Sequence, residues 1–450
     1  MSHPSWQSPA LPLATLQRNF AEHHPPLSVR EAQLEASRCL YCFDAPCQVA
    51  CPTSIAVPHF IKRIAAGDTQ GAGQTILGAN PLGASCARVC PVEALCEGAC
   101  VMNHLHTPIM IGRLQRFATD ATHAAPPLGD VAARHSLGKK VAIVGSGPAG
   151  LSCAMDLARR GAEVVIFEAR PLAGGLATYG IVPYRLPGDI AQHEVSMAGE
   201  LGVTIRTNCA VGRDVTVADV LREFDAVFLA VGTGSVRRLG IPGDDLDGVW
   251  DALEFIGRIR TEKLDAIPVG RHTIVIGAGN TAMDAANSAA KLGAGSVDVV
   301  YRRTEETMGA YPGEIEMARA LGVRFHFLTV PLRIEGEGRV QRLVCVRATL
   351  GEPDATGHRD PVPVAGSECV FAADVVIRAV GQAKPTALLD SFGVTHRHGA
   401  AIVDAATRQT ANPRVYAGGD LVNGGLEAVN AVDDGRVAAR GILRSWGVSA

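Results

Sequence analysis

Two short apolar runs, each ending in a glycine, organise the central part of the chain. Residues 141–144 read Val-Ala-Ile-Val before Gly145, and residues 273–276 read Thr-Ile-Val-Ile before Gly277. Continuous apolar runs of this length are typical of parallel strands buried on both faces, and each run is followed by a stretch compatible with a helix. The pattern therefore predicts two strand–glycine–helix units, about 130 residues apart.

The first 122 residues follow another pattern, in which helix-compatible stretches such as 29–37 and 58–67 alternate with cysteine-rich segments. A linker of prolines and small residues begins at His123, which indicates a crossing at the surface. With 450 residues the chain is long enough for about three domains. We expect a boundary near residue 122 and a second domain that opens at the first apolar run.

Charge and hydropathy narrow the class of protein. The chain has 42 basic and 45 acidic residues, a net charge of −3, and no basic tail, so nucleic acid is not expected as a partner. Its start lacks a cationic segment followed by an apolar core, and no apolar run approaches the ~20 residues that cross a bilayer. We expect a cytoplasmic protein with no membrane contact.

Eight of the 12 cysteines lie between Cys39 and Cys100. In a cytosolic protein such clustering indicates metal binding rather than disulfides. The pattern runs Cys39-x2-Cys42-x4-Cys47-x3-Cys51-Pro52 and then Cys90-Pro91-x4-Cys96-x3-Cys100. It is similar to the ferredoxin-type runs that hold [4Fe–4S] clusters. Zinc is the alternative, but zinc sites usually show two matched Cys-x2-Cys pairs, and seven cysteines exceed one tetrahedral ion.

Two clusters need eight ligands, which leaves one unassigned. Cys86 is a candidate, with a small buried structural residue as the alternative interpretation.

The first glycine-rich turn reads Gly145-x-Gly147-x-x-Gly150, and the following strand ends at Glu168. The glycines allow a tight turn, close approach to a pyrophosphate and packing of helix on strand, while the acid is placed to bond ribose hydroxyls. We predict an FAD site here. Further FAD contacts are expected from two close-approach loops and from the Ala-Gly-Gly-Asp segment near the C-terminus: Gly174, Gly175, Gly232, Gly419 and Asp420.

The second turn reads Gly277-x-Gly279-x-x-Ala282, and its second strand ends in Arg302-Arg303 rather than in an acid. Arginines favour a 2′-phosphate, so we expect NADP(H) rather than NAD(H), with solvated surface arginines as the alternative. The expected nucleotide contacts are Gly277, Gly279, Asn280, Thr281, Arg302 and Arg303. Hydride transfer between stacked cofactors needs no catalytic acid–base residue.

The four remaining cysteines are isolated in the sequence, which gives no redox-active pair of the thioredoxin reductase kind: Cys153, Cys209, Cys345 and Cys369. Electrons are therefore expected to leave through the clusters.

The order of these motifs resembles the glutamate synthase small subunit and the N-terminal half of dihydropyrimidine dehydrogenase, from about Arg30 to Gly441. Two details favour the pyrimidine branch, the spacing from Cys90 to Cys96 and the segment 111–117 that contains Gln115. The resemblance implies one cluster held by Cys39, Cys42, Cys47 and Cys100, and a second held by Cys51, Cys90, Cys96 and Gln115. Asn280 departs from the family, which usually carries Asp there.

The resemblance implies the fold class α/β, with a helical iron–sulfur domain (1–122), an FAD domain (136–265 and 375–450) and an inserted NAD(P)H domain (266–374). It implies an electron-input subunit that takes hydride from NAD(P)H onto FAD and sends single electrons through two [4Fe–4S] clusters. The expected partner in the heteromer carries FMN and reduces uracil or thymine. The alternatives are a small subunit of glutamate synthase or of a bifurcating transhydrogenase-type NADPH oxidoreductase, and a scaffold with no catalytic activity.

Overall fold

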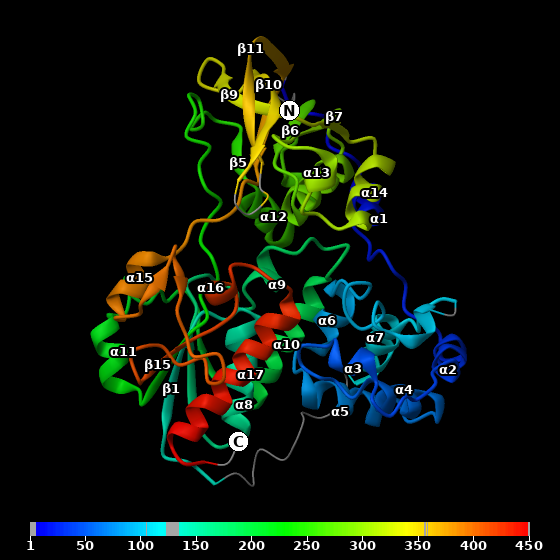
Figure 1. The fold of residues 1–450 in the computed structure, drawn as a ribbon, viewed down its shortest axis with the longest axis vertical. Helices are drawn as coiled ribbons and strands as arrows, with labels where there is room; N and C mark the ends of the chain where they lie inside the picture. The colour runs from blue at the N-terminus through cyan, green and yellow to red at the C-terminus, as the bar shows by residue number, and fades with distance from the viewer. Residues whose placement is uncertain (1–5, 105, 123–134, 355–356, 358, 449–450) are drawn as a thin grey trace. The chain divides into compact units, whose positions relative to one another are not determined.

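The computed structural model describes residues 6–104, 106–122, 135–354, 357 and 359–448 (Figure 1). The chain forms two compact units, each treated by itself below. The larger unit comprises residues 23–178, 185–233 and 384–450, and the smaller comprises residues up to 22, 179–184 and 234–383. Among the described residues, no helix has both the length and the apolar character that crossing a bilayer would need.

Short helices form the first part of the larger unit. Ser28 begins α2 with a capping box, since its side chain accepts from the N–H of Glu31 and the Glu31 carboxylate accepts from the N–H of Ser28. The apolar faces meet in a core around the fully buried Phe60 and Leu114. The helices are α2 (Val29–Ser37), α3 (Pro46–Val49), α4 (Val57–Ala65), α5 (Thr69–Ala79), α6 (Gly83–Val89), the 3-10 helix η1 (Val101–His104) and α7 (Ile111–Thr122).

A five-stranded parallel sheet forms the second part of the larger unit. Its order is β15 (Val415–Ala417), β4 (Ala226–Leu229), β1 (Lys140–Val144), β2 (Glu163–Phe167) and β3 (Thr204–Arg206). Strand β1 pairs with β2 on one side and β4 on the other. The chain therefore reverses its direction of winding at the carboxyl end of β1, which is where ligands bind in open α/β sheets.

Helix α8 (Pro148–Arg159) follows β1 and packs against α17 (Ala428–Ser445), and Figure 1 shows the two side by side. The close approach requires Gly435, because a Cβ there would lie 2.2 Å from the carbonyl oxygen of Ala149. The other elements of this part are α9 (Leu176–Tyr179), α10 (Gly188–Glu200), α11 (Val217–Glu223), α15 (Thr386–Ser391), α16 (Asp420–Asn423) and the hairpin β13 (His396–Arg397) with β14 (Ala400–Ala401).

A buried carboxylate joins the helical part of this unit to the sheet part. Glu194 on α10 accepts hydrogen bonds from the backbone N–H of Ser85 (2.9 Å) and from the Ser85 hydroxyl on α6. Burial raises the pKa of Glu194 to about 7, although the bonds from Ser85 and Ala84 act against the shift. Cys86 of α6 also shares one apolar core with Met155 of α8.

The Glu194 pKa predicts a stability that depends on pH. Because the folded-state pKa lies above the ordinary glutamate value of 4.5, the folded state binds more protons between about pH 4.5 and 7, so stability falls as pH rises. A shift of this size corresponds to about 3 kcal/mol. We expect Glu194→Gln to remove that loss. The free energy of unfolding in urea should therefore rise for the variant relative to the unaltered chain between pH 5 and pH 8. Parallel pH profiles for the two proteins would contradict the prediction.

The smaller unit has a second five-stranded parallel sheet. Its order is β5 (Val249–Asp251), β12 (Val375–Arg378), β6 (His272–Ile276), β7 (Ser296–Val300) and β8 (Arg324–His326), so that β6 occupies the switch position. Its helices are α1 (Leu13–Asn19), α12 (Ala252–Thr261), η3 (Leu264–Ala266), α13 (Asn280–Leu292), η4 (Glu305–Thr307) and α14 (Pro312–Ala320). A separate antiparallel sheet contains β9 (Thr329–Glu335), β10 (Arg342–Pro353) and β11 (Arg359–Ala372).

The structure confirms the predicted fold class of a helical domain followed by Rossmann-like α/β domains. The two compact units comprise other residue ranges than the predicted domains. Helix α1 packs in the core of the smaller unit, where Asn19 donates to the carbonyl of Lys291 (2.7 Å), although residues 1–122 were expected to form one domain. Strand β5 pairs with β12 and so joins the second sheet rather than the first. The predicted domain boundaries themselves stay a prediction.

Candidate functional site

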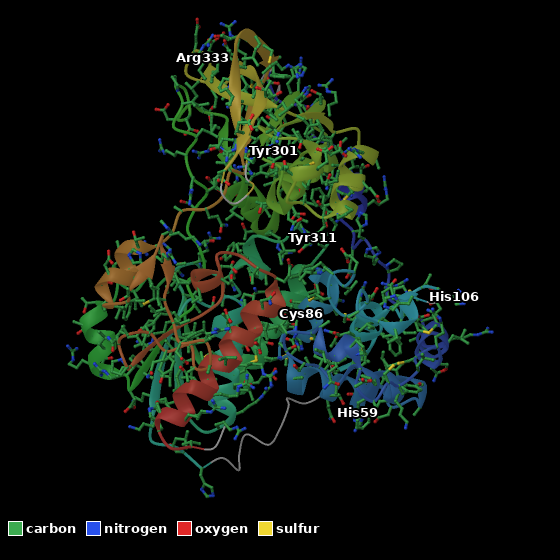
Figure 2. All side chains as sticks on the ribbon, viewed as in Figure 1. His59, Cys86, His106, Tyr301, Tyr311 and Arg333 are labelled. Carbon is green, nitrogen blue, oxygen red and sulfur yellow. The ribbon has the colours of Figure 1, made fainter. Side chains whose placement is uncertain are left out.

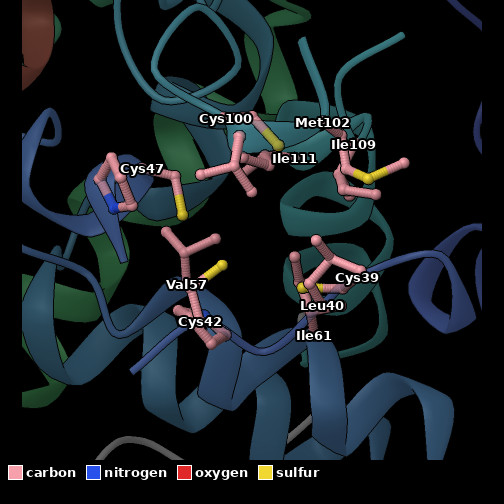
Figure 3. Close-up of a pocket in the computed structure, with 13 residues that line it drawn as sticks. Cys39, Leu40, Cys42, Cys47, Val57, Ile61, Cys100, Met102, Ile109 and Ile111 are labelled. Carbon is pink, nitrogen blue, oxygen red and sulfur yellow. The ribbon is translucent and has the colours of Figure 1, made fainter. Parts of the chain in front are cut away.

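Four thiols converge on one pocket in the helical part of the larger unit. Cys39, Cys42, Cys47 and Cys100 line a space of about 350 Å³, counting its open mouth, and Figure 3 shows their sulfur atoms around it. Apolar side chains complete the wall, among them Val57, Ile61, Ile109 and Ile111. These are the four cysteines that the family resemblance assigns to one cluster.

The electrostatics of this pocket suit a positively charged group. Burial raises the pKa of the Cys47 thiol to about 11, with further contributions from Cys100 and Cys39. Burial likewise raises the pKa of Cys39, with the nearby Cys42 and Cys100 adding to the shift. Thiols bind metal as thiolates, so a cluster that supplies positive charge compensates for the cost of ionising them together. The donor set therefore fits an iron–sulfur cluster.

A single metal ion suits this geometry less well. Within the described parts of the chain, no group of three or more Cys, His, Asp or Glu residues is placed to hold one ion. Zinc needs each of its sulfur ligands at about 2.3 Å from one centre. A [4Fe–4S] cluster instead takes its ligands at separate corners, so four thiols spread around a pocket match it better.

A second set of thiols gathers at the end of α6. A hydrogen bond with Cys86 raises the pKa of Cys90, together with burial and the nearby Cys96 and Cys51. Burial raises the pKa of Cys96 to about 12, and Glu97 and Cys51 add to it. The structure therefore brings Cys51, Cys90 and Cys96 together, as expected, and it places Cys86 among them.

Gln115 lies on α7 and is buried. Its side-chain nitrogen donates to the carbonyl of Gly83 at 2.8 Å, which holds the amide in place and leaves its oxygen as the atom that could bind iron. Cys86 lies on the same short helix as Gly83. Both Gln115 and Cys86 remain candidates for the eighth ligand, and the choice between them stays a prediction.

The first glycine-rich turn has the close contacts that its glycines predict. Gly145 has φ +99°, and a Cβ there would lie 2.5 Å from the carbonyl oxygen of Ala230. Gly147 begins α8 as its N-cap. A Cβ on Gly150 would lie 2.1 Å from the carbonyl oxygen of Gly145. The turn thus leaves the backbone amides at the start of α8 open to an anion.

Ser146, which the sequence reasoning missed, connects two of the predicted FAD contacts, Glu168 and Gly174. The Glu168 carboxylate accepts from the backbone N–H of Ser146 (3.1 Å) and from its hydroxyl. The hydroxyl oxygen accepts from the N–H of Gly174 (3.0 Å), and a Cβ on Gly175 would lie 2.6 Å from the Cα of Gly147. Nothing in the local sequence signals this role, because the position between the first two glycines of the motif admits many residues.

The C-terminal segment that contains Gly419 and Asp420 also lies at the start of α8. Gly419 has φ +67°, and a Cβ on it would lie 3.1 Å from the Cβ of Ala149, at the start of α8. Its N–H donates to Asp434 (2.8 Å), a residue of α17 that the sequence did not indicate. Burial raises the pKa of the adjacent Asp420. Gly232, with φ +65°, lies in the loop that follows β4, close to the Ala230 carbonyl that contacts Gly145.

The second turn repeats this arrangement at the end of β6. Gly277 has φ +129°, and a Cβ there would lie 2.3 Å from the carbonyl oxygen of Ala379. Gly279 is the N-cap of α13, so Asn280 and Thr281 form its first turn. The Asn280 side-chain oxygen accepts from the N–H of Tyr311 at 2.9 Å. A carboxylate could accept the same bond, so the departure from Asp is compatible with this fold.

Arg302 and Arg303 follow β7, and Figure 2 locates the preceding Tyr301 in the smaller unit. Arg302 is exposed and Arg303 is partly buried. The Arg303 carbonyl accepts from the N–H of Leu328 (3.0 Å), which anchors the loop to the start of the antiparallel sheet. Their contact with a nucleotide stays a prediction.

Two cysteines that are isolated in the sequence are neighbours in the structure. Cys345 on β10 lies opposite Cys369 on β11. Burial raises the pKa of Cys345 to about 12, and Cys369 adds to the shift. They form no Cys-x2-Cys motif, and a thiol so difficult to ionise is a poor nucleophile.

Known proteins share this combination of sites. The family described as dihydropyrimidine dehydrogenase domain II, 4Fe-4S cluster, matches residues 16–126, and the family described as pyridine nucleotide-disulphide oxidoreductase matches residues 139–435. FprA of Mycobacterium tuberculosis in complex with NADPH is similar in fold, with a TM-score of 0.55 and 22% identity, over 69% of this chain and 86% of that one. The matched domains imply an iron–sulfur centre, FAD and a nicotinamide nucleotide.

Curated relatives match nearly the whole chain. The glutamate synthase [NADPH] small chain of Escherichia coli (strain K12) is 38% identical over 459 residues, which cover 97% of this chain and 96% of that protein. The NADP(+)-dependent formate dehydrogenase subunit beta of Moorella thermoacetica is 39% identical over 419 residues, which cover 88% of this chain and 59% of that protein. The chain therefore belongs to the family of the glutamate synthase small chain, with an iron–sulfur domain ahead of a pyridine nucleotide-disulphide oxidoreductase domain.

Proposed function

We propose that this chain is the electron-input subunit of a glutamate synthase-type heteromer and that it oxidises NADPH. The observation that carries the proposal is the presence, in one chain, of a four-thiol pocket and two nucleotide-binding turns. FAD supplies the conversion of a hydride, which carries two electrons, into the single electrons that iron–sulfur clusters carry.

The residues of this chain supply binding and orientation. In the proposal, the amides of Gly147 and of the start of α8 bind the FAD pyrophosphate, Gly145 allows the tight turn, and Glu168 bonds the ribose. Gly279 and the first turn of α13 bind the nicotinamide nucleotide, with Arg302 on the 2′-phosphate. The first cluster is held by Cys39, Cys42, Cys47 and Cys100, and the second by Cys51, Cys90, Cys96 and either Gln115 or Cys86.

The relatives favour a glutamate synthase partner over the pyrimidine partner expected from the sequence. The pyrimidine assignment rested on the Cys90–Cys96 spacing and on Gln115, whereas the likeness to the small chain extends over 97% of the chain. The description of the matched iron–sulfur family favours dihydropyrimidine dehydrogenase as a second candidate. Relatives named as subunits of NADPH-dependent enzymes support a heteromer in either case.

The test uses the chain purified anaerobically, with and without candidate partners. The chain alone should oxidise NADPH when an artificial acceptor such as ferricyanide is present. Adding the glutamate synthase large chain should make the oxidation depend on glutamine and 2-oxoglutarate. Dependence on uracil with an FMN-containing partner would instead establish the second candidate. Bound FAD that neither coenzyme reduces would overturn the electron-input role and favour the scaffold.

The coenzyme preference can be tested at Arg302. A charge-assisted hydrogen bond to a 2′-phosphate contributes about 1.5–3 kcal/mol. We therefore expect Arg302→Ser to raise the KM for NADPH roughly 10- to 100-fold and to leave the KM for NADH almost unchanged. Arg347, an exposed arginine on β10, provides the matched control Arg347→Ser. Equal changes in both KM values would show that Arg302 does not read the phosphate.

A further inference from the structure

Large apolar side chains lie exposed between the thiols of the first pocket. Phe43 is fully exposed, Val49 is 80% exposed, Leu40 is 57% exposed and Tyr41 is 39% exposed. We call these four residues the collar. They lie within two residues of Cys39, Cys42 or Cys47 in the sequence, and Leu40 lines the thiol pocket directly.

The backbone at the collar is held in an unusual conformation. Tyr41 has φ +52°, which is rare for a large side chain. Its hydroxyl donates to the carbonyl of Ala36 (3.2 Å), and its backbone N–H bonds to the Cys39 thiol. This conformation fixes the segment beside the pocket, so that Leu40 and Phe43 are presented from an ordered surface rather than from a loose loop.

The two thiol sets differ in their surroundings within the larger unit. Cys51 and Cys90 pack against the apolar core that contains β1 and α8, next to the first nucleotide-binding turn. Cys39, Cys47 and Cys100 pack in the separate core of the helical part, which Cys51 and Cys96 also contact. The second set is thus the one that contacts the core of the proposed FAD site, and Leu40 of the collar lines the pocket of the first set.

From the position and chemistry of the collar we infer that it is the docking surface for the electron-accepting partner subunit. The inference rests on the proposed function, because it takes the first thiol set as the exit for electrons. Electron transfer falls off steeply with distance, so the partner's redox centre must come close to that pocket. Exposed apolar patches mark interaction sites, and aromatic residues are enriched at interfaces.

The charge of the segment specifies the chemistry of the partner. Between residues 40 and 49, Asp44 is the only charged side chain. A surface of this kind binds a complementary apolar face by excluding water, not by electrostatic attraction. The partner subunit therefore presents an apolar face around its own redox centre, and the affinity should change little with salt.

The experiment compares variants that leave the pocket residues intact. Phe43→Ser combined with Val49→Ser removes the two most exposed members of the collar, and Val49→Glu is a second, smaller change. Val370→Ser is the matched control, because Val370 is also 60% exposed and lies on β11 in the other unit. Iron content, visible absorption and NADPH oxidation with ferricyanide should stay unchanged in all three variants.

Binding to the glutamate synthase large chain from the same organism is then measured by titration. We expect the collar variants to weaken binding at least 10-fold and Val370→Ser to leave it unchanged. Equal binding by the collar variants and the unaltered chain would overturn the docking site but leave the proposed function standing. A steep loss of affinity between low and high salt would have the same consequence, because it would show that electrostatic attraction dominates the binding. Failure of the unaltered chain to bind would overturn the glutamate synthase partner and this docking site together.

Discussion

Replacing Cys47 by serine should remove the iron of the first pocket, about four atoms per chain for a [4Fe–4S] cluster. Cys47 follows the first residue of the short helix α3, which aims its sulfur into the pocket with those of Cys39, Cys42 and Cys100. Serine keeps the shape of the side chain, but a hydroxyl is a much poorer ligand for iron than a thiolate. The three remaining thiols of the pocket then lack the fourth ligand that the cluster needs.

The same substitution should lower stability. Free energy of metal binding is also free energy of folding when the site does not exist in the unfolded chain. The helical part has small helices of four to 12 residues, so its order depends strongly on what its core and its ligands provide. We expect the thermal unfolding midpoint to fall, while FAD content stays near that of the unaltered chain because the first nucleotide-binding turn is formed by other elements.

The control is Cys209→Ser, since Cys209 is a partly buried cysteine outside both thiol sets. It should keep full iron content and visible absorption. Full iron content in the Cys47→Ser variant would show that Cys47 is not a ligand. Zinc in place of iron in the unaltered, anaerobically purified chain would instead establish the zinc alternative.

Sequence reasoning succeeds here where the signal is local. The turn at Gly277 is predictable because a strand, a tight turn and a helix follow one another in the sequence. Gly277 has the positive φ and the close contact with Ala379 that the motif demands. The cysteine spacing is equally informative, because cysteines a few positions apart in the sequence can bind one cluster in only a few backbone conformations.

The sequence is uninformative where the structure depends on contacts between distant segments. Ser146 and Asp434 acquire their roles only when Glu168, Gly174 and Gly419 are brought beside them. Cys345 and Cys369 become neighbours through a strand pairing that no local pattern specifies. Helix α1 likewise contacts α13, which lies some 270 residues further along the chain, as the bond from Asn19 to Lys291 shows.

The family could be inferred from the order of motifs, but the branch could not. Gln115 and the Cys90–Cys96 gap are two local details, and neither decides which partner the chain serves. Gln115 bonds to Gly83, and Cys86 lies beside Cys90, so there are two candidates for the fourth ligand of the second cluster. Partner choice depends on exposed surface such as the collar, which carries no periodic signal and becomes visible only in the folded chain.

Replacing Gly150 by alanine should abolish FAD binding, although alanine is the better helix former. Gly150 lies in the first turn of α8, where the added Cβ would lie 2.1 Å from the carbonyl oxygen of Gly145 and 3.2 Å from Ile143. The helix gains about 1 kcal/mol from alanine. The oxygen belongs to the backbone of the nucleotide-binding turn itself and cannot rotate away, and overpacking of this kind costs about 1–3 kcal/mol or more. Relief requires β1 and α8 to separate, which displaces the amides that face the pyrophosphate.

The same substitution at Gly199 isolates the steric effect. Gly199 is an exposed residue of α10, and no atom lies within 4 Å of the position that an alanine methyl would take there. Gly199→Ala should therefore gain stability by up to about 1 kcal/mol and keep its FAD. FAD content is measured by absorbance after release, and stability by thermal unfolding. We expect Gly150→Ala to lose FAD and to unfold at a lower temperature, and Gly199→Ala to unfold at a higher one. This pair of results would show that the contact with Gly145 causes the loss. Normal FAD content in Gly150→Ala would mean that the first turn is not the pyrophosphate site, and the FAD assignment would then fall to other residues.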